Sequence, residues 1–285
     1  MLLSLLVGGS AGAATNVRMM IPAVGFYAFL AVLFVVLGIG SILARRWARA
    51  LTLVLAWMWL AGGILALLMM SVWMPNVFDA AAQEQQLPPQ AMIVMQVVML
   101  GTMGCMYLVV PGVFVSFYQS PHVKATCEFK DPHVRWTDNC PLPVLALSLL
   151  LGFGAATMLF SVCYGGVIPF FGILLKGVPS ALVILCITLL FAYLSWATYK
   201  LKMGAWWTTL VFYGVLGISA IVTFSRIKMM NFYREMNFPE EQLELMQKSG
   251  MVDRMNMPLM MGASFAAIVG FMLWVRRYFV AAKKR

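Results

Sequence analysis

Residues 178–225 read VPSALVILCITLLFAYLSWATYKLKMGAWWTTLVFYGVLGISAIVTFS, and this stretch decides the fold class. It contains two apolar runs, 178–199 and 204–225, which are separated by a short turn that carries Lys200 and Lys202. A helix needs about 20 apolar residues to cross a hydrocarbon core of about 30 Å, and each run has that length without a charged residue. Because lipid offers no hydrogen-bond partners to the backbone, each run must satisfy its own peptide groups as a helix. The stretch therefore predicts two consecutive transmembrane helices.

Apolar runs of this kind occur seven times along the chain. The predicted spans are 21–43, 50–74, 91–118, 142–165, 178–199, 204–225 and 258–275. The 285 residues are 62% hydrophobic and 11% charged, with a mean hydropathy of +0.89, which is far more apolar than a soluble domain of this size. The runs lack the alternation of barrel strands. We expect an all-α integral membrane protein: a seven-transmembrane-helix bundle that forms one membrane domain over 1–285.

The positions of the basic residues predict the orientation. If the N-terminus faces outward, 13 of the 20 Lys and Arg residues fall in cytoplasmic segments and seven fall outside. The short loop ARRWAR is strongly basic, whereas the next loop, 75–90, carries only Asp79 and Glu84. Since Lys and Arg favour cytoplasmic loops, we expect the N-terminus outside and the C-terminus in the cytoplasm. The opening stretch MLLSLLVGGSAGAAT resembles the cleavage end of a secretory signal but has no charge before Arg18, so it predicts a retained arm and leaves cleavage open.

The formal net charge of +10 has two readings, a nucleic acid or an anionic membrane surface. The cations lie in turns next to the spans and in the tail RRYFVAAKKR, so we expect lipid headgroups as their partners and no nucleic acid. The spans contain no Asp, Glu, Lys, Arg or His, and the chain has no hydrolase, zinc-protease or phosphate-loop motif. We therefore predict neither an enzyme nor a cofactor. Polar residues such as Ser195, Ser219 and Thr223 predict hydrogen bonds between helices.

The first three and the last three spans share a layout. Each triplet has a basic inner turn before a Trp-bearing helix, and then a longer outer segment with acidic and helix-forming residues. With 142–165 between them, the triplets would form a 3-1-3 parallel repeat, a plan used by seven-helix sugar carriers. The alternative is that basic turns and interfacial Trp residues are generic to membrane proteins.

The outer segment 226–257 contains one clear helix signal. Pro239 suits a first helical position, Glu240 and Glu241 favour the positive end of the helix dipole, and Gly250 can close the helix. We expect a helix over about 239–249 that rests on the membrane surface or on the top of the bundle. Docking of another membrane protein through 226–257 is the alternative.

The inner loop 119–141 holds the densest group of polar residues. Its candidate interaction residues are His122, Cys127, His133, Trp136, Asp138 and Cys140. The order and spacing of the Cys and His residues match no usual zinc motif. A disulfide between Cys127 and Cys140 would conflict with a cytoplasmic loop, so their pairing stays open. We expect a structured loop with Trp136 at the interface, through which a membrane-protein partner could bind.

Methionine is unusually frequent, with 24 residues in the chain. In the third span, Met residues recur every three or four positions and fall on one helical face. The members of this stripe are Met92, Met95, Met99, Met103 and Met106. Thioethers can select Cu(I), so Met95, Met99 and Met103 are candidate ligands for Cu(I) or Ag(I). The alternative is that Met fills gaps between helices, as it commonly does.

Three stretches carry a resemblance: ARRWARALTLVLAWMWL, HVKATCEFKDPHVRWTDNCPLPVLALSL and PEEQLELM. They resemble segments of uncharacterised multi-pass membrane proteins of bacteria. The resemblance implies a bacterial inner (plasma) membrane and no activity or site residue. From all of these features we expect a non-catalytic accessory or scaffolding component of a membrane complex. The alternative is a facilitator for a small neutral solute, or for Cu(I) or Ag(I) along the Met stripe.

Overall fold

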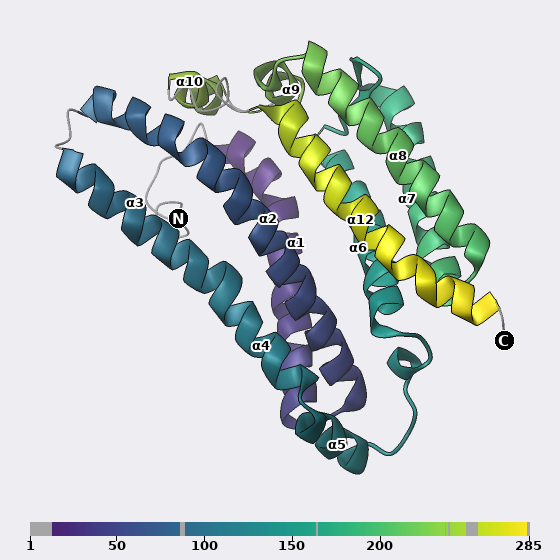
Figure 1. Ribbon diagram of the computed structural model, residues 1–285. Helices are drawn as coiled ribbons and strands as arrows, with labels where there is room; N and C mark the ends of the chain where they lie inside the picture. Colours follow the sequence, from purple (N-terminus) through teal and green to yellow (C-terminus); the bar gives the residue numbers. More distant parts are fainter. Residues whose placement is uncertain are drawn as a thin grey trace.

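The computed structural model describes residues 13–85, 89–163, 165–236, 238, 240–248 and 256–283. Within these residues, seven helical segments are long and apolar enough to cross a membrane, and each coincides with a predicted span. The spanning segments are α1 (Ala13–Ile42), α2 (Arg46–Gln85), α3 (Pro89–Gly104) continued by the π-helical turn η1 (Cys105–Val109) and by α4 (Val110–Gln119), α6 (Leu142–Cys163), α7 (Gly177–Tyr199), α8 (Met203–Arg226) and α12 (Met257–Lys283). The prediction of an all-α seven-helix bundle is confirmed (Figure 1).

Some helices extend beyond the apolar runs that predict them. α2 and α3 occupy most of the predicted outer loop 75–90, where the residues DAAAQEQQ have high helix propensity. α12 continues to Lys283, through residues that the sequence assigns to a tail. In that extension Phe279 is fully buried, and the apolar helix that can cross a membrane reaches Ala282, so the predicted limit at 275 is too short. Cleavage of the N-terminal arm stays open, because the stretch 1–15 lies outside the described part of the chain except for its last three residues, with which α1 begins.

The main apolar core lies among α6, α7, α8 and α12. Trp206 of α8 is buried there, and its indole Nε1 donates a hydrogen bond of 2.9 Å to the carbonyl oxygen of Met272 in α12. α6 and α7 are joined by a reciprocal pair of bonds. The hydroxyl of Ser148 donates to the carbonyl oxygen of Ser195 at 2.8 Å, and the hydroxyl of Ser195 donates to that of Ser148 at 2.7 Å. Such bonds contribute about 0.6 kcal/mol each in lipid.

The first three spans form a separate group beside this core (Figure 1). α2 packs against α1 and α4. We call the end of the bundle that the Lys and Arg distribution predicts to be cytoplasmic the inner end, and the opposite end the outer end. The inner end of α2 meets α6 through a small cluster that includes Ala50, Val54 and Leu145. α6 itself packs mainly along α7 and much less against α2. In the second triplet α8 likewise contacts both α7 and α12. The parallel repeat stays a prediction, because contact of a middle helix with both neighbours is common in helical bundles.

Pro111 accounts for the irregular third span. Proline has no N–H, so the carbonyl group of Tyr107 loses its usual partner four residues ahead, and the π-helical turn lies at this position. Tyr107 also abuts α2. A Cβ atom on Gly63 would lie 2.6 Å from the Tyr107 carbonyl oxygen, so only glycine permits this approach of the two helices.

The connection between α6 and α7 forms a β-hairpin, which the sequence does not predict. Strands β1 (Ile168–Phe170) and β2 (Ile173–Leu175) pair antiparallel around a two-residue turn, Phe171–Gly172, in which both residues have positive φ. This is the backbone that type I′ hairpin turns require. The amide of Phe171 donates to Ser219 Oγ at 3.0 Å, and that of Gly172 donates to Thr223 Oγ1 at 2.9 Å. The two hydroxyls of α8 thus hold the hairpin tip, and the expectation that they join two helices is wrong.

Two short helices follow α8 at the outer end. α9 (Met229–Glu235) is not predicted by the sequence, whereas α10 (Glu240–Lys248) confirms the helix expected at about 239–249. Leu243 of α10 is buried, and Phe238 packs against Tyr233 of α9 with ring centroids 5.2 Å apart. α10 therefore rests on the bundle through α9. Pro239 and Gly250, which signal its ends, lie outside the described residues.

Candidate functional site

The inner end of the bundle carries α5 (Pro121–Lys130) and the end of α12 (Figure 1). Residues 121–141, which include α5 and the 3-10 turn η2 (Trp136–Asp138), fold against the first turn of α2. We call residues 121–141 the inner platform. Two carboxylates anchor it. Three basic residues contact it or the end of α4 beside it: Arg45, just before α2, and Arg46 and Arg49 of its first turn.

Asp131 is the central anchor of the inner platform. Its side chain is 1% exposed, and Arg135 grips both carboxylate oxygens, with Nη2 donating to Oδ1 at 2.9 Å and Nε donating to Oδ2 at 3.1 Å. Arg45 Nη1 lies 4.0 Å from the same carboxylate. The hydrogen bonds from Arg135, with its charge and the backbone N–H of Arg46, lower the pKa of Asp131 below its ordinary value. A buried carboxylate with such partners is ionised and holds the chain around it in place.

A second set of contacts joins the inner platform to α2 and α7. Asp138 Oδ2 accepts the backbone N–H of Arg135 at 3.1 Å and lies 3.9 Å from Arg46 Nη1. The hydroxyl of Tyr199, at the end of α7, donates to the carbonyl oxygen of Trp136 at 2.8 Å. The inner platform is thus attached to helices of both halves of the bundle.

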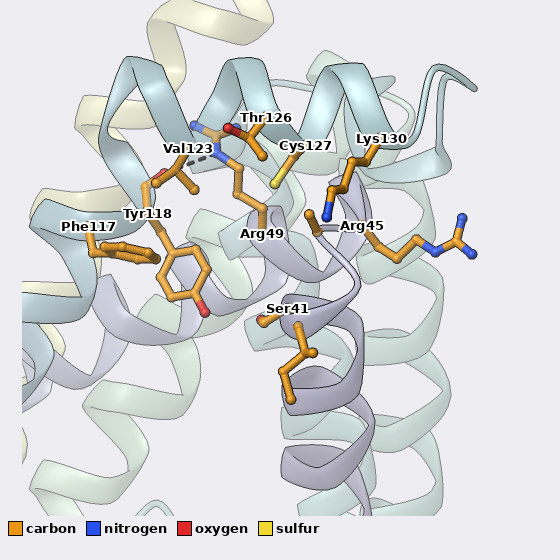
Figure 2. Close-up of a pocket in the computed structure, with 11 residues that line it drawn as sticks. Ser41, Arg45, Arg49, Phe117, Tyr118, Val123, Thr126, Cys127 and Lys130 are labelled. Carbon is orange, nitrogen blue, oxygen red and sulfur yellow. Dashed lines mark hydrogen bonds between the residues drawn. The ribbon is translucent and has the colours of Figure 1, made fainter.

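A cavity of about 340 Å³ lies between the inner platform and the inner ends of α1, α2 and α4. Three cationic side chains line it: Arg45, Arg49 and Lys130. Arg49 is positioned by a hydrogen bond of 3.0 Å from its Nε to the carbonyl oxygen of Tyr118 (Figure 2). The remaining wall is formed by Ser41, Ile42, Ala44, Phe117, Tyr118, Val123, Thr126 and Cys127. This arrangement can bind an anion that also carries an apolar part.

The candidate interaction residues of the loop do not form one site. The side chains of His122, His133, Trp136 and Asp138 are exposed at different points of the inner platform. Cys127 lines the cavity, whereas Cys140 is buried in the small cluster between α2 and α6. Among the residues that the structure describes, no group of three His, Cys, Asp or Glu side chains is placed to hold a metal ion.

Both loop cysteines are free thiols in the structure. Burial raises the pKa of Cys127, and it raises that of Cys140 to about 11. Since the thiolate is the reactive form, these thiols are poor nucleophiles at neutral pH. They serve as small apolar packing groups rather than as reactive residues.

The methionine stripe lies on the least buried span. Met95 and Met106 are 48% and 52% exposed, and Met99 and Met103 are half-buried. Met92 lies where the side chains are not described. The binding of Cu(I) by Met95, Met99 and Met103 stays a prediction, as does their role as packing residues. Replacing these three residues together by Leu would keep the helix apolar, so unchanged copper uptake would remove the metal hypothesis.

In the sequence, Arg45 and Arg49 indicate only the orientation, and no pattern assigns a role to Asp131. One feature of the sequence does indicate that these residues could pair. The basic loop 44–49 and the acidic residues of 119–141 fall on the same predicted side of the membrane, where opposite charges can pair. The partners could not be assigned because the contacts join residues far apart in sequence, such as Arg49 and Tyr118, 69 positions apart.

Comparison with known proteins finds no matching family model, no matching curated protein and no matching solved structure. The fold and the site define the class directly: a multi-pass helical membrane protein whose inner end carries an ordered basic surface.

Proposed function

We propose that this protein is a non-catalytic accessory component of a membrane complex, and that its inner platform binds a protein partner. The observation that carries the proposal is the exposure of large apolar side chains on an ordered surface outside the spans. Phe129 is 88% exposed, Val134 is 70% exposed and Trp136 is 48% exposed. Aromatic and apolar side chains of this kind are typical of the centres of protein interfaces.

The order of the inner platform supports this proposal. Arg135 and Asp131 hold the platform backbone around the exposed residues, and Tyr199 ties Trp136 to the end of α7. A surface that is already ordered loses little conformational entropy on binding, so a few apolar contacts are enough for a stable complex. Arg135 and the exposed Glu128 supply a polar rim.

The polar residues of the spans also favour a structural role. Ser148 and Ser195 bond each other across α6 and α7, and Thr209 bonds the backbone of its own helix. Ser219 and Thr223 hold the hairpin. The hydroxyl groups of these five residues therefore serve structural hydrogen bonds, which is the usual role of Ser and Thr in membrane helices.

The test is native mass spectrometry of the full-length protein extracted gently from its own membrane. The proposal expects a defined complex with a second polypeptide in the unmodified protein. A variant with Phe129→Ser and Val134→Ser should lose that polypeptide, because it removes the apolar contacts and leaves the Asp131 anchor in place.

The matched control is Phe170→Ser, which removes an exposed aromatic residue from the outer hairpin. It should retain the partner. Recovery of the unmodified protein alone, or equal retention of the partner in both variants, would contradict the proposed function.

A further inference from the structure

The inner platform (121–141) and the neighbouring start of α2 with the turn before it (43–49) carry more basic than acidic side chains. The basic residues are Arg45, Arg46, Arg49, Lys124, Lys130 and Arg135, and the acidic residues are Glu128, Asp131 and Asp138. Each carboxylate already has a partner. Glu128 lies 3.9 Å from Lys124, Asp131 lies 2.9 Å from Arg135, and Asp138 lies 3.9 Å from Arg46.

Two cations remain without a carboxylate. Within the described chain, neither Arg49 nor Lys130 has an acidic group within 4.0 Å, and both line the same cavity. Arg45, which lines it too, is 4.0 Å from an Asp131 that Arg135 already holds at 2.9 Å. Unneutralised charges that share one concave site attract an anion. The cavity therefore has an excess of positive charge that the protein itself does not neutralise.

The cavity has a basic side and an apolar side. The apolar side lies at the ends of two spans. Ile42, at the end of α1, is 83% exposed, and Phe117, near the end of α4, is 57% exposed. Leu43 next to the cavity is 52% exposed. Exposed apolar residues at the end of a span face the acyl chains of the bilayer. A ligand that fits both halves has a negatively charged head and a hydrocarbon tail.

We propose that this cavity binds the phosphodiester headgroup of an anionic phospholipid, with its phosphate on Arg49 and Lys130 and its acyl chains along Ile42 and Phe117. Basic pockets between membrane helices on the cytoplasmic side bind such headgroups. Guanidinium groups are well suited to phosphate, and Arg49 uses its Nε for Tyr118, which leaves its terminal nitrogens for the ligand.

The same residues set the headgroup preference. A zwitterionic headgroup brings an ammonium group, which needs a carboxylate partner. No carboxylate is among the residues that line the cavity, and Asp131, the neighbour of Lys130 in the sequence, is 1% exposed and engaged by Arg135. An anionic lipid with a neutral headgroup alcohol therefore binds more tightly than a zwitterionic lipid. This inference is independent of the proposed function, because it concerns the cavity and not the exposed face of Phe129, Val134 and Trp136.

The experiment is native mass spectrometry of the delipidated full-length protein in detergent, incubated with phosphatidylglycerol or with phosphatidylcholine of the same acyl chains. We expect one phosphatidylglycerol molecule to remain bound under conditions that remove phosphatidylcholine. Lys130→Gln should weaken phosphatidylglycerol binding about fivefold, since a basic residue at a lipid surface contributes a factor of that size. Val123→Trp should abolish binding by filling the cavity while all three cations remain.

The matched control is Lys124→Gln, which makes the same charge change on α5 outside the cavity lining and should bind as the unmodified protein does. If Val123→Trp fails to fold, the comparison of Lys130→Gln with Lys124→Gln still decides. Equal retention of the two lipids would overturn the proposal, as would equal binding by Lys130→Gln and Lys124→Gln. Thermal stabilisation by inorganic phosphate without retention of phosphatidylglycerol would also overturn it, because the site would then take a soluble anion.

Discussion

At the scale of single residues, Asp131 anchors the inner platform. It is a buried carboxylate whose partners come from its own loop and from the turn before α2. Removing one partner of a buried ion pair leaves the other charge uncompensated, which is more harmful than the loss of an exposed pair. Trp206 has a comparable role in the main core, because its indole joins α8 to α12.

The first prediction concerns pH. The folded pKa of Asp131 is lowered from its ordinary value of 3.8, so the ionised form stabilises the inner platform at every pH above that value. The contribution disappears as the pH falls below it, through the folded pKa. Hydrogen exchange of peptides from 131–141, corrected for the intrinsic rate, should be constant from neutral pH to about pH 4 and rise below. In Asp131→Asn, the same peptides should already exchange rapidly at neutral pH. If they are as protected as in the unmodified protein, Asp131 does not anchor the inner platform.

A second residue-scale prediction concerns Trp206. Trp206→Phe removes the bond to the Met272 carbonyl oxygen and should lower the free energy of unfolding by about 1 kcal/mol, whereas Trp206→Ala should lower it by about 3–5 kcal/mol by opening a cavity. The neighbouring Trp207, 49% exposed, provides the control. Thermal unfolding in detergent should rank Trp207→Phe near the unmodified protein; a larger loss in Trp207→Phe than in Trp206→Phe would contradict the assignment.

At the scale of elements, irregular backbone occurs where a partner element accommodates it. The π-helical turn of the third span lies against Gly63 of α2, and the hairpin tip lies against Ser219 and Thr223 of α8. In both places non-helical or strained backbone within a membrane protein depends on a specific neighbour, as the low polarity of lipid requires. The two contacts can be tested by changing the neighbour alone.

Gly63→Val should separate α2 from the π-helical turn η1 of the third span. The new Cβ would lie 2.6 Å from the Tyr107 carbonyl oxygen, a backbone atom that cannot move without disturbing its helix. We expect a loss of about 1–3 kcal/mol in unfolding free energy, the usual result of overpacking. Gly62→Val is the control, because a Cβ at Gly62 meets nothing within 4 Å. The contact is assigned wrongly if the two variants unfold at the same temperature.

Ser219→Ala combined with Thr223→Val should release the hairpin tip, since the amides of Phe171 and Gly172 lose their acceptors. Hydrogen exchange of these two amides should accelerate, while the rest of α8 stays protected. Ser225→Ala serves as the control, because the Ser225 hydroxyl bonds only the Ile221 carbonyl of its own helix. Unchanged exchange in the double variant would show that the strands hold the turn without α8.

At the scale of the whole molecule, the two groups of helices have different packing. α6, α7, α8 and α12 share a large buried core, whereas α1 to α4 offer most of their surface to lipid. The first group joins the core through the inner end of α2 and through Phe26 of α1, whose ring contacts Phe153 and Phe160 of α6. The basic residues gather at that same inner end. The Asp131 anchor, the cluster of basic residues and the candidate lipid site thus lie at the same end of the bundle.

This coincidence makes the topology testable. Reporter domains attached after the C-terminus and inserted in α5 should be active in the cytoplasm, whereas a reporter inserted at the Phe171–Gly172 turn should be active outside. The reason is the distribution of Lys and Arg, with 13 of 20 on the expected inner side. Opposite compartments for all three reporters would reverse the orientation and place the basic cavity outside.

The sequence by itself determined the number of spans, their limits to within a few residues in most cases, and the short helix α10. Each of these depends on local composition, since a run of apolar residues must become helical in lipid whatever its neighbours are. Tertiary structure alone decided the hairpin and the cavity. Phe171 takes its conformation beside Ser219, 48 positions away, and Arg49 meets Tyr118 69 positions away. Hydropathy is a property of one residue at a time, whereas a hydrogen bond or an uncompensated charge depends on which residues the fold brings together.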